Sequence, residues 1–176
     1  MSQLKVNSIV PVGGLPVGAT GGGIIQVVSA AKTDTSSLTP SGTAVVDIPG
    51  LSVSITAAAS GNKIFISAMV AISSSSSGMG LTLLRDSTEI FVGDAAGSRG
   101  RLTTNQENQG NTIDSKTVPV IFVDTAPDTS AHTYKLGVKE TDGGGNTFQI
   151  NRGTNNNDQT NRARVVSSIT VMEVTT

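Results

Sequence analysis

The chain of 176 residues contains no cysteine and no tryptophan, and it has only one histidine and one tyrosine. Without cysteine, neither a disulfide nor a thiolate metal site can form. A single histidine is also too few for a zinc site built from histidines. Packing, strand pairing and contacts between subunits must therefore hold the fold. The scarcity of aromatic rings further limits the stacking surfaces that many sugar sites use.

Charge is also scarce, because only 14% of the residues are charged. The 12 basic and 13 acidic residues give a net charge of −1, and no basic run is present. Nucleic acids and anionic membranes are therefore disfavoured as partners. No run approaches the roughly 20 apolar residues of a membrane helix, so no membrane insertion is expected. The N-terminus lacks a basic region followed by a continuous apolar stretch, so we expect no signal peptide and synthesis in a cytoplasm.

Residues 1–23 form a segment rich in glycine and proline that is expected to be extended. Lys5 is its only charged side chain, so a solvated disordered tail describes it poorly. At about 3.3 Å per residue it could reach roughly 75 Å, far enough to cross onto another subunit or another protein. Docking back on its own domain is the alternative. We expect an anchoring arm that uses the apolar residues Leu4, Val6, Ile9, Val12, Leu15 and Val17.

From Ile24 onward, short apolar segments with a period of two residues are separated by Gly, Pro, Ser and Asn. This rhythm is typical of a β-sandwich or barrel. For residues 24–176 we expect an all-β, jelly-roll-like antiparallel β-sandwich with almost no helix. Roughly ten strands are expected among the segments 24–30, 43–48, 51–56, 63–72, 79–86, 89–92, 99–104, 116–123, 132–141, 146–151 and 164–174.

Two segments, 64–72 and 118–123, are apolar on both sides of the expected strand. A strand that is buried on both faces needs a second covering layer. Another subunit could supply that layer, which makes these runs candidates for an oligomer interface. The alternative is plain sandwich core with a bulge or edge position at Pro119, since proline cannot donate to a strand ladder. The candidate interface residues are Ile64, Ile66, Val118, Val120 and Phe122.

Turn chemistry predicts two hairpins, one at residues 85–89 and one at the glycine-rich segment 142–146. The longer polar stretches, at 73–77, 94–98, 105–114 and 153–161, are expected to be loops at the ends of the sandwich. Loops at such positions often carry recognition residues. Arginines in or beside them could meet acidic groups of a carbohydrate or a partner subunit, although such arginines are more often rim charges. The candidate contacts of these loops are Arg99, Arg101, Asn155, Asn156 and Asp158.

Signals for catalysis are weak. His132 with Asp128 and a serine could be assembled into a triad, but no Gly-x-Ser-x-Gly elbow is present, and His132 is expected at the start of a strand. No spacing singles out a pair of carboxylates for glycoside chemistry. The oxygen-rich loops 124–128 and 155–158 could hold calcium but lack the calcium-loop pattern. No phosphate-cradling glycine motif occurs. We therefore expect neither a catalytic site nor a cofactor or metal.

Several segments resemble a known group of proteins. These are Leu4–Ile9, Gly23–Val28 with Lys32–Thr35, Gly50–Ile55, Leu83–Asp86, Gly93–Arg99 and Ser168–Glu173. They are similar to segments of virion fibre proteins of tailed bacteriophages, particularly those of marine and cyanobacterial hosts. The resemblance implies a homotrimeric β-sandwich head on the virion surface, with the N-terminus as its attachment end. Unlike long fibres, this chain has no coiled-coil heptads and no repeat that could form a shaft.

The resulting hypothesis is a non-enzymatic virion structural protein. Its expected partners are two further copies of itself, another virion protein bound through the arm, and a host surface glycan or protein bound by the distal loops. Two alternatives remain open: a capsid decoration protein that stabilises the shell, and a surface depolymerase. The missing shaft leaves open whether the chain is a tail fibre or a short appendage on the capsid.

Overall fold

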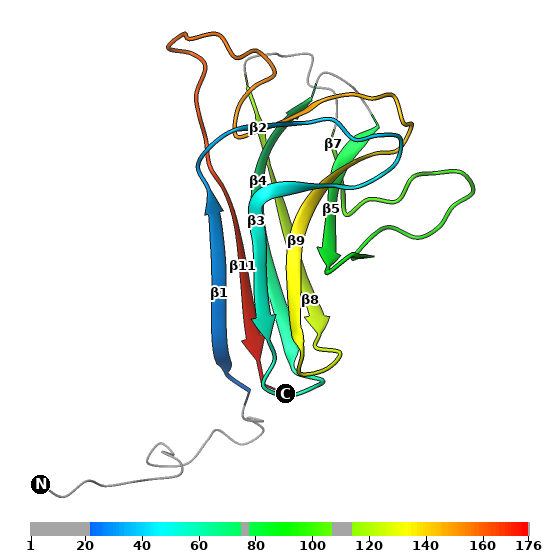
Figure 1. The fold of residues 1–176 in the computed structure, drawn as a ribbon, viewed down its shortest axis with the longest axis vertical. Helices are drawn as coiled ribbons and strands as arrows, with labels where there is room; N and C mark the ends of the chain where they lie inside the picture. Colours follow the sequence, from blue (N-terminus) through cyan, green and yellow to red (C-terminus); the bar gives the residue numbers. More distant parts are fainter. Residues whose placement is uncertain (1–21, 75–77, 107–113, 176) are drawn as a thin grey trace, which may run out of the picture.

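A computed structural model describes residues 22–74, 78–106 and 114–175 of the chain. Their regular structure consists entirely of strands, arranged as two antiparallel sheets packed face to face (Figure 1). The predicted all-β sandwich is therefore confirmed. The six residues proposed to anchor the arm, Leu4, Val6, Ile9, Val12, Leu15 and Val17, lie outside the described residues.

Sheet A has the strand order β1-β11-β4-β8. Beyond the end of β11, β4 pairs with the short strand β10, which pairs in turn with β2. The strands of sheet A are β1 (Ile24–Lys32), β2 (Ser36–Leu38), β4 (Lys63–Ser74), β8 (Lys116–Thr125), β10 (Phe148–Ile150) and β11 (Ser167–Val174).

Sheet B has the order β3-β9-β5, and the short strands β6 and β7 share the remaining edge of β5. Eight positions remain when the short strands β2 and β10 are left out and β6 and β7 are counted as one. Numbered along the chain, these positions lie in the order 1-8-3-6 in sheet A and 2-7-4-5 in sheet B. This is the strand order of a jelly roll. The strands of sheet B are β3 (Val46–Thr56), β5 (Met79–Arg85), β6 (Thr88–Ile90), β7 (Thr104–Gln106) and β9 (Ala131–Glu140).

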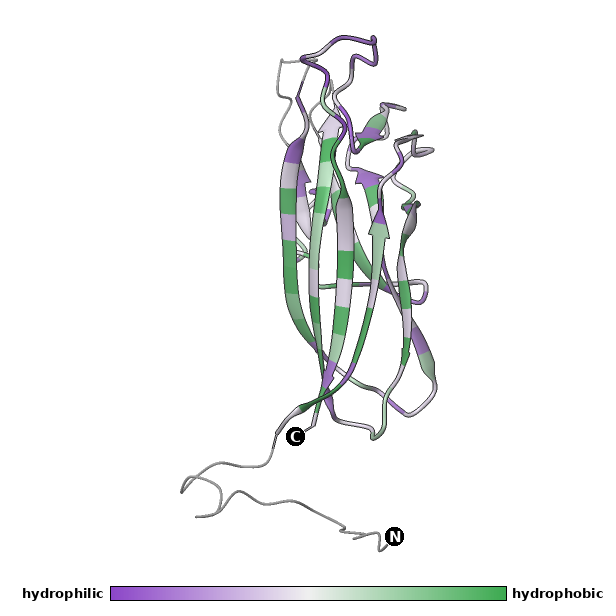
Figure 2. Cartoon of the chain, turned by 90° about the vertical axis from the view of Figure 1, so that its left-hand side faces the viewer, coloured by the Kyte–Doolittle hydropathy of each residue, from purple (hydrophilic) through white to green (hydrophobic). Residues whose placement is uncertain are grey.

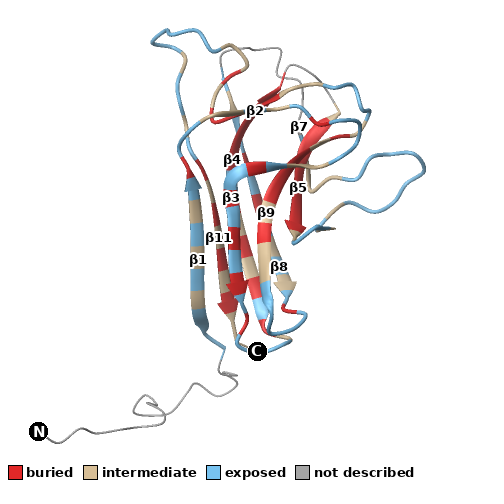
Figure 3. Ribbon diagram, viewed as in Figure 1, coloured by how far each residue is buried: buried red, intermediate tan, exposed pale blue. Residues whose placement is uncertain are grey.

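The core lies between the two sheets and follows from the period of two residues along each strand. Every second residue of β4 faces sheet B, and the opposing residues of β9 and β5 complete the layer. Figure 3 shows β5 buried along its length, whereas β1 at the edge of sheet A carries exposed residues. The largest fully buried side chains are Tyr134, Phe148, Ile48, Leu51, Ile64, Ile66, Ile72, Met79, Leu81, Leu83, Leu136 and Ile150.

Two predicted strands, 43–48 and 51–56, are a single strand. β3 runs from Val46 to Thr56, and both of its halves pair with β9. The register shifts between Asp47 and Ser52, where Pro49 and Gly50 interrupt the ladder and Gly50 has a φ of 82°. A kinked strand that keeps one neighbour looks like two strands in the sequence, because proline and glycine are also the residues that end strands.

The two hairpin predictions have opposite outcomes. Strands β5 and β6 form a hairpin in which Arg85 pairs with Thr88, so the first prediction is confirmed. The segment 142–146 instead crosses from β9 in sheet B to β10 in sheet A, so the second prediction is wrong. The buried Glu140 carboxylate stabilises this crossover by accepting hydrogen bonds from the backbone of Gly145 and Asn146.

Smaller differences concern the strand ends and one missed strand. The predicted segment 99–104 is loop except at its last residue, where β7 begins, and the short strand β2 was not predicted. Pro119 lies on β8, an edge strand that pairs only with β4, and the register there is continuous. The edge position of Pro119 is thus confirmed, and the bulge is not observed. β11 lies between β1 and β4, so it is a central strand of sheet A.

Gly80 allows β5 and β7 to approach closely. A Cβ atom at residue 80 would lie 2.0 Å from the backbone carbonyl oxygen of Thr104. We expect Gly80→Ala to lower the free energy of unfolding by about 1–3 kcal/mol, the usual cost of overpacking. Denaturant unfolding at one fixed protein concentration measures this. Gly93→Ala is the matched control, because a Cβ there meets nothing within 4 Å. Equal stability of the two variants would contradict the prediction.

Candidate functional site

The proposed interface residues lie mainly inside the sandwich. Ile64, Ile66, Val118 and Val120 are at most 8% exposed and belong to the core, while Phe122 is partly buried against it. They face sheet B because they share the inward phase of β4 and β8. These positions are therefore covered by the chain itself, and the alternative of plain sandwich core describes them correctly. The neighbouring residues of the same two strands face outward.

The outward residues of sheet A include a group of exposed apolar side chains. One row crosses all four strands, because Val27 is opposite Met172, Met172 is opposite Phe65, and Phe65 is opposite Val123. Ile25, Val27, Met69, Ile121 and Val123 are each at least 50% exposed. We call this surface the apolar face and define it as Ile25, Val27, Phe65, Met69, Ile121, Val123, Met172 and Val174.

Polar groups on the apolar face are mainly small hydroxyls. The next outward row contains Ser29, Thr170 and Ser67 before it reaches Ile121. Lys63 lies at one end of the face, where its ammonium group donates to the Thr125 hydroxyl. Four strands spaced by about 4.8 Å, over about seven residues of about 3.3 Å, cover roughly 400 Å² in all, with the hydroxyl row included. The largest patch on a typical monomer has a similar size and is often functional.

The outer face of sheet B is different in kind. It carries exposed hydroxyls, such as those of Ser54 and Thr133, which are 2.8 Å apart and hydrogen-bonded. Its charges are paired: Lys135 contacts Asp47 at 2.6 Å, and Lys139 contacts Glu89 at 2.8 Å. Such a surface is compatible with water. Only one of the two sheets thus presents a large apolar exterior.

Side chains from both sheets close the side of the sandwich between β5–β6 and β8. The rings of Phe91 and Phe122 stack with their centroids 4.5 Å apart. The Asp124 carboxylate accepts from the Arg85 guanidinium at 2.6 Å and from the Tyr134 hydroxyl at 2.8 Å. Burial, and then the bond to Asp124, raises the pKa of Tyr134, so this hydroxyl stays protonated and donates. These contacts hold the edge strand β8 against sheet B.

His132 is the second residue of β9, so it lies at the start of a strand as predicted. Its Nδ1 is 2.7 Å from an Asp86 carboxylate oxygen, and its Nε2 is 3.1 Å from an Asp128 oxygen. Both nitrogens can donate only when the ring is protonated. The bond to Asp86 and then that to Asp128 accordingly raise the pKa of His132. Both ring nitrogens thus face carboxylates, and neither is directed at a serine hydroxyl.

The oxygen-rich loops considered for calcium have other roles where the structure describes them. Asp128 accepts from the backbone of Ser130 as well as from His132. Among residues 22–74, 78–106 and 114–175, no three His, Asp or Glu side chains gather in a way that could hold a metal ion. Within the same ranges, no helix is long and apolar enough to cross a membrane.

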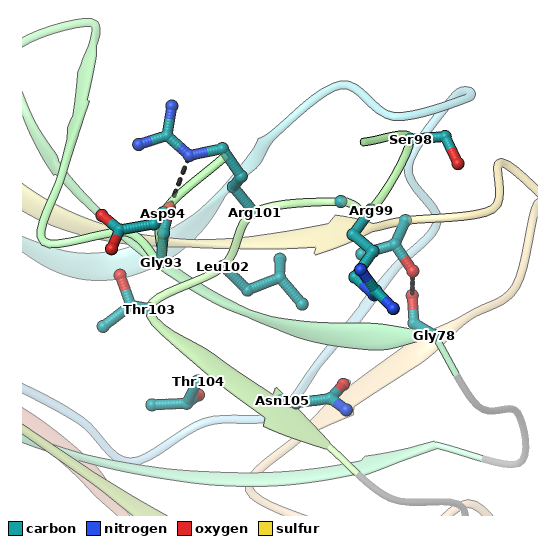
Figure 4. A pocket seen from close by; sticks show the side chains of 12 residues that line it. Gly78, Gly93, Asp94, Ser98, Arg99, Arg101, Leu102, Thr103, Thr104 and Asn105 are labelled. Atoms are coloured by element: carbon teal, nitrogen blue, oxygen red, sulfur yellow. Dashed lines mark hydrogen bonds between the residues drawn. The ribbon is translucent and has the colours of Figure 1, made fainter. Parts of the chain in front are cut away.

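The predicted loop contacts fall into two separate pockets. Arg99 and Arg101 line a depression of about 550 Å³ beside Gly78 and Thr141 (Figure 4). Arg101 donates through Nε to the carbonyl oxygen of Gly93, and in Figure 4 its guanidinium points away from Arg99. Asn155, Asn156 and Asp158 line a second pocket, of about 220 Å³. The five residues therefore do not form one site.

The second pocket lies in residues 152–164, which we call the arginine loop. Arg152, Arg162 and Arg164 line this pocket together with the predicted residues. The loop lies at the end of the sandwich away from the start of β1 and the end of β11 (Figure 1). Figure 2 shows that residues at this end are predominantly hydrophilic. Gly23 and Thr175 are hydrogen-bonded to each other at the opposite end.

No protein-family model matches this chain, and a search of curated proteins finds no significant similarity. The geometry described above therefore carries the functional argument.

Sequence reasoning missed the apolar face, although the signal was present. A strand that is apolar on both sides contributes one set of residues to the core and the other to the exterior. The predicted set in β4 and β8 is the inner one, and the outer set is Phe65, Met69, Ile121 and Val123. In β4 the inner set is apolar from Ile64 to Ile72, whereas the outer set also contains Lys63 and Ser67. The pattern of β1, where Ile25 and Val27 are outward, pointed to the same face.

The cluster of His132, Asp86 and Asp128 predicts a pH dependence of stability. The raised pKa of His132 means that its stabilisation is complete below its ordinary value of 6.5 and is lost as pH rises through the folded-state value. The pKa values of Asp86 and Asp128 are lowered, so the stabilisation that these carboxylates contribute is lost only as pH falls below 3.8. We therefore expect the unfolding free energy to fall as pH rises from 6 to 8.

Chemical denaturation at several pH values tests this expectation. His132→Gln should flatten the slope between pH 6 and 8, because the titrating group is gone. Lys135→Gln is the control, since it removes an ion pair to Asp47 without removing a group that titrates in this range. An unchanged slope in His132→Gln would show that the His132 cluster does not cause the pH dependence.

Proposed function

We propose that this protein is a non-enzymatic structural protein of a tailed-phage virion, a homotrimeric surface appendage that presents polar loops to a host surface. The observation that carries the proposal is the apolar face of sheet A. A sheet face with an exposed apolar row across all four strands is often an interaction surface. Sheet B, whose outer face has hydroxyls and paired charges, has no such need.

Copies of the same chain are the partner that best fits this face. The face is nearly free of charge, so it offers no electrostatic complementarity to a charged partner. Its aliphatic side chains, two methionines and a phenylalanine are residue types found in the apolar cores of subunit interfaces. Both edges of sheet A, at Val27 and at Ile121, are apolar, so the surface can be shared between two neighbours in a closed ring. The fibre resemblance implies that the ring has three members.

The placement of the start of β1 and the end of β11 opposite the arginine loop supports the host-attachment role. The chain enters β1 and leaves β11 at one end, and the arginine loop lies at the other (Figure 1). An arm bound to the particle at the first end would direct the arginine loop outward. A capsid decoration protein could have the same arrangement, but its loop end would then face solvent and bind no ligand. A test of binding to cells therefore separates the two functions.

The first test is the mass of the protein in solution. Light scattering or sedimentation should give three times the chain mass of 17.9 kDa. Ile121→Glu or Val27→Glu should weaken association at least about 100-fold, because each would bury an unpaired carboxylate. Ser52→Glu is the control on the outer face of sheet B, where residue 52 is exposed and opposite Lys135. A wild-type monomer, or equal effects of all three substitutions, would contradict the proposed interface.

The second test concerns the particle. Deletion of residues 1–21 should yield a folded trimer that no longer enters virions, because the proposed anchor is gone. Electron microscopy of labelled particles then measures location and copy number. A few dozen copies or fewer fits a fibre, whereas hundreds on the shell would favour capsid decoration. Virions that retain the truncated protein would contradict anchoring by the arm.

A further inference from the structure

The arginine loop gathers positive charge that no described carboxylate neutralises. Arg152, Arg162 and Arg164 line one pocket, and none of them forms an ion pair within the described part of the chain. Asp158 is the only acidic residue of the lining. Burial and then the nearby charge of Arg164 lower the pKa of Arg152. A bound anion would offset the repulsion between guanidinium groups in one pocket.

One guanidinium nitrogen of Arg162 has no hydrogen-bond partner among the described residues. This atom, Nη1, is buried, while Nε of the same side chain is 3.4 Å from the Gln159 side-chain oxygen. A buried donor of a charged group left unpaired is costly, and proteins generally satisfy it with a ligand, water or ion. Arg152 is held differently, since it donates to the carbonyl oxygen of Gly153 at 3.1 Å and to the Ser37 hydroxyl at 2.9 Å.

The base of the loop is hydrogen-bonded to the sandwich. Asn151 is fully buried with a φ of 62°, and its side-chain amide donates to the carbonyl oxygens of Lys32 and Asp34. The Ser167 hydroxyl donates to the Asn151 side-chain oxygen at 2.6 Å. At the closing end, the amide of Val165 donates to the Asn151 carbonyl oxygen. Anchoring of this kind reduces the entropy lost on binding.

The remaining lining suggests what accompanies the anion. Asn155, Asn156, Asn157 and Gln159 offer amide donors and acceptors, and the pocket has no aromatic wall. Amides that surround a guanidinium pair match a ligand with several hydroxyls and one acid group. The volume of about 220 Å³ is below the roughly 300–1,000 Å³ of sites for drug-sized ligands, so it suits one sugar ring.

We propose that the arginine loop is a binding site for an anionic sugar unit, one that carries a carboxylate or sulfate, with Arg162 and Arg164 as the residues that bind the acid group. This inference rests on the proposed function, because it gives the distal end of the head a ligand of defined chemistry. The pocket lined by Arg99 and Arg101 is not part of the site, because it lies in a different loop and Arg101 is already engaged by the Gly93 carbonyl oxygen.

Titration of the full-length protein with glucuronate, glucose and inorganic sulfate, followed by calorimetry or NMR, tests the proposal. Glucuronate should bind at least about tenfold more tightly than glucose, and more weakly as salt is raised. Arg162→Gln and Arg164→Gln should each weaken glucuronate binding about tenfold, whereas the matched control Arg99→Gln should leave it unchanged. Thermal melts establish that each variant is folded, and two separate variants guard against one that is not.

Equal binding of glucuronate and glucose, or equal losses in all three variants, would overturn the inference. Sulfate that binds as tightly as glucuronate would also overturn it, because the sugar ring would then contribute nothing. The outcomes separate from those of the proposed function. A trimer on virions that fails to bind glucuronate would contradict only the proposed sugar site. A monomer that binds glucuronate would contradict only the proposed trimer.

Discussion

Strand β4 is the element on which the rest of the sandwich depends. It pairs along its length with β8 on one side and with β11 and then β10 on the other, so it holds sheet A together. Its inward residues Ile64, Ile66 and Ile72 are almost completely buried against sheet B. Its outward residues Phe65 and Met69 lie at the centre of the apolar face. One strand therefore supplies both the core of the chain and the middle of its proposed subunit interface.

Buried polar groups hold the loops at the ends of the strands. Glu173 accepts from the backbone of Ala58 and the side chain of Asn62, and Glu140 accepts from two backbone amides of the 142–146 crossover. Asn151 ties the arginine loop to β1 and β11. Each is almost fully buried and hydrogen-bonded, so loss of one partner would leave a buried group unsatisfied. The polar loops are thus held on rigid bases, which is what a binding surface requires.

The fold was more predictable from the sequence than the site was. The β5–β6 turn was predicted correctly because its pairing is local, between Arg85 and Thr88. The segment 142–146 was misassigned as a hairpin because its glycines suit many turns, and the deciding contact is the Glu140 carboxylate. The residues predicted for an interface, Ile64, Ile66, Val118 and Val120, lie in the core of the chain. Asn155 and Asp158 were predicted as loop contacts, and the folding of the loop brings them into one pocket with Arg152, Arg162 and Arg164.

The sequence by itself determined that this chain is an all-β sandwich without thiolate chemistry, since alternation with period two and the absence of cysteine are properties of the chain alone. Only the tertiary structure decided which phase of each doubly apolar strand is covered. In β4 the inward phase is apolar from Ile64 to Ile72, whereas the outward phase mixes Phe65 and Met69 with Lys63 and Ser67; the position of sheet B buries Ile66 and leaves Met69 exposed. The same holds for the three arginines of the loop, whose shared pocket depends on a backbone path that no residue spacing encodes.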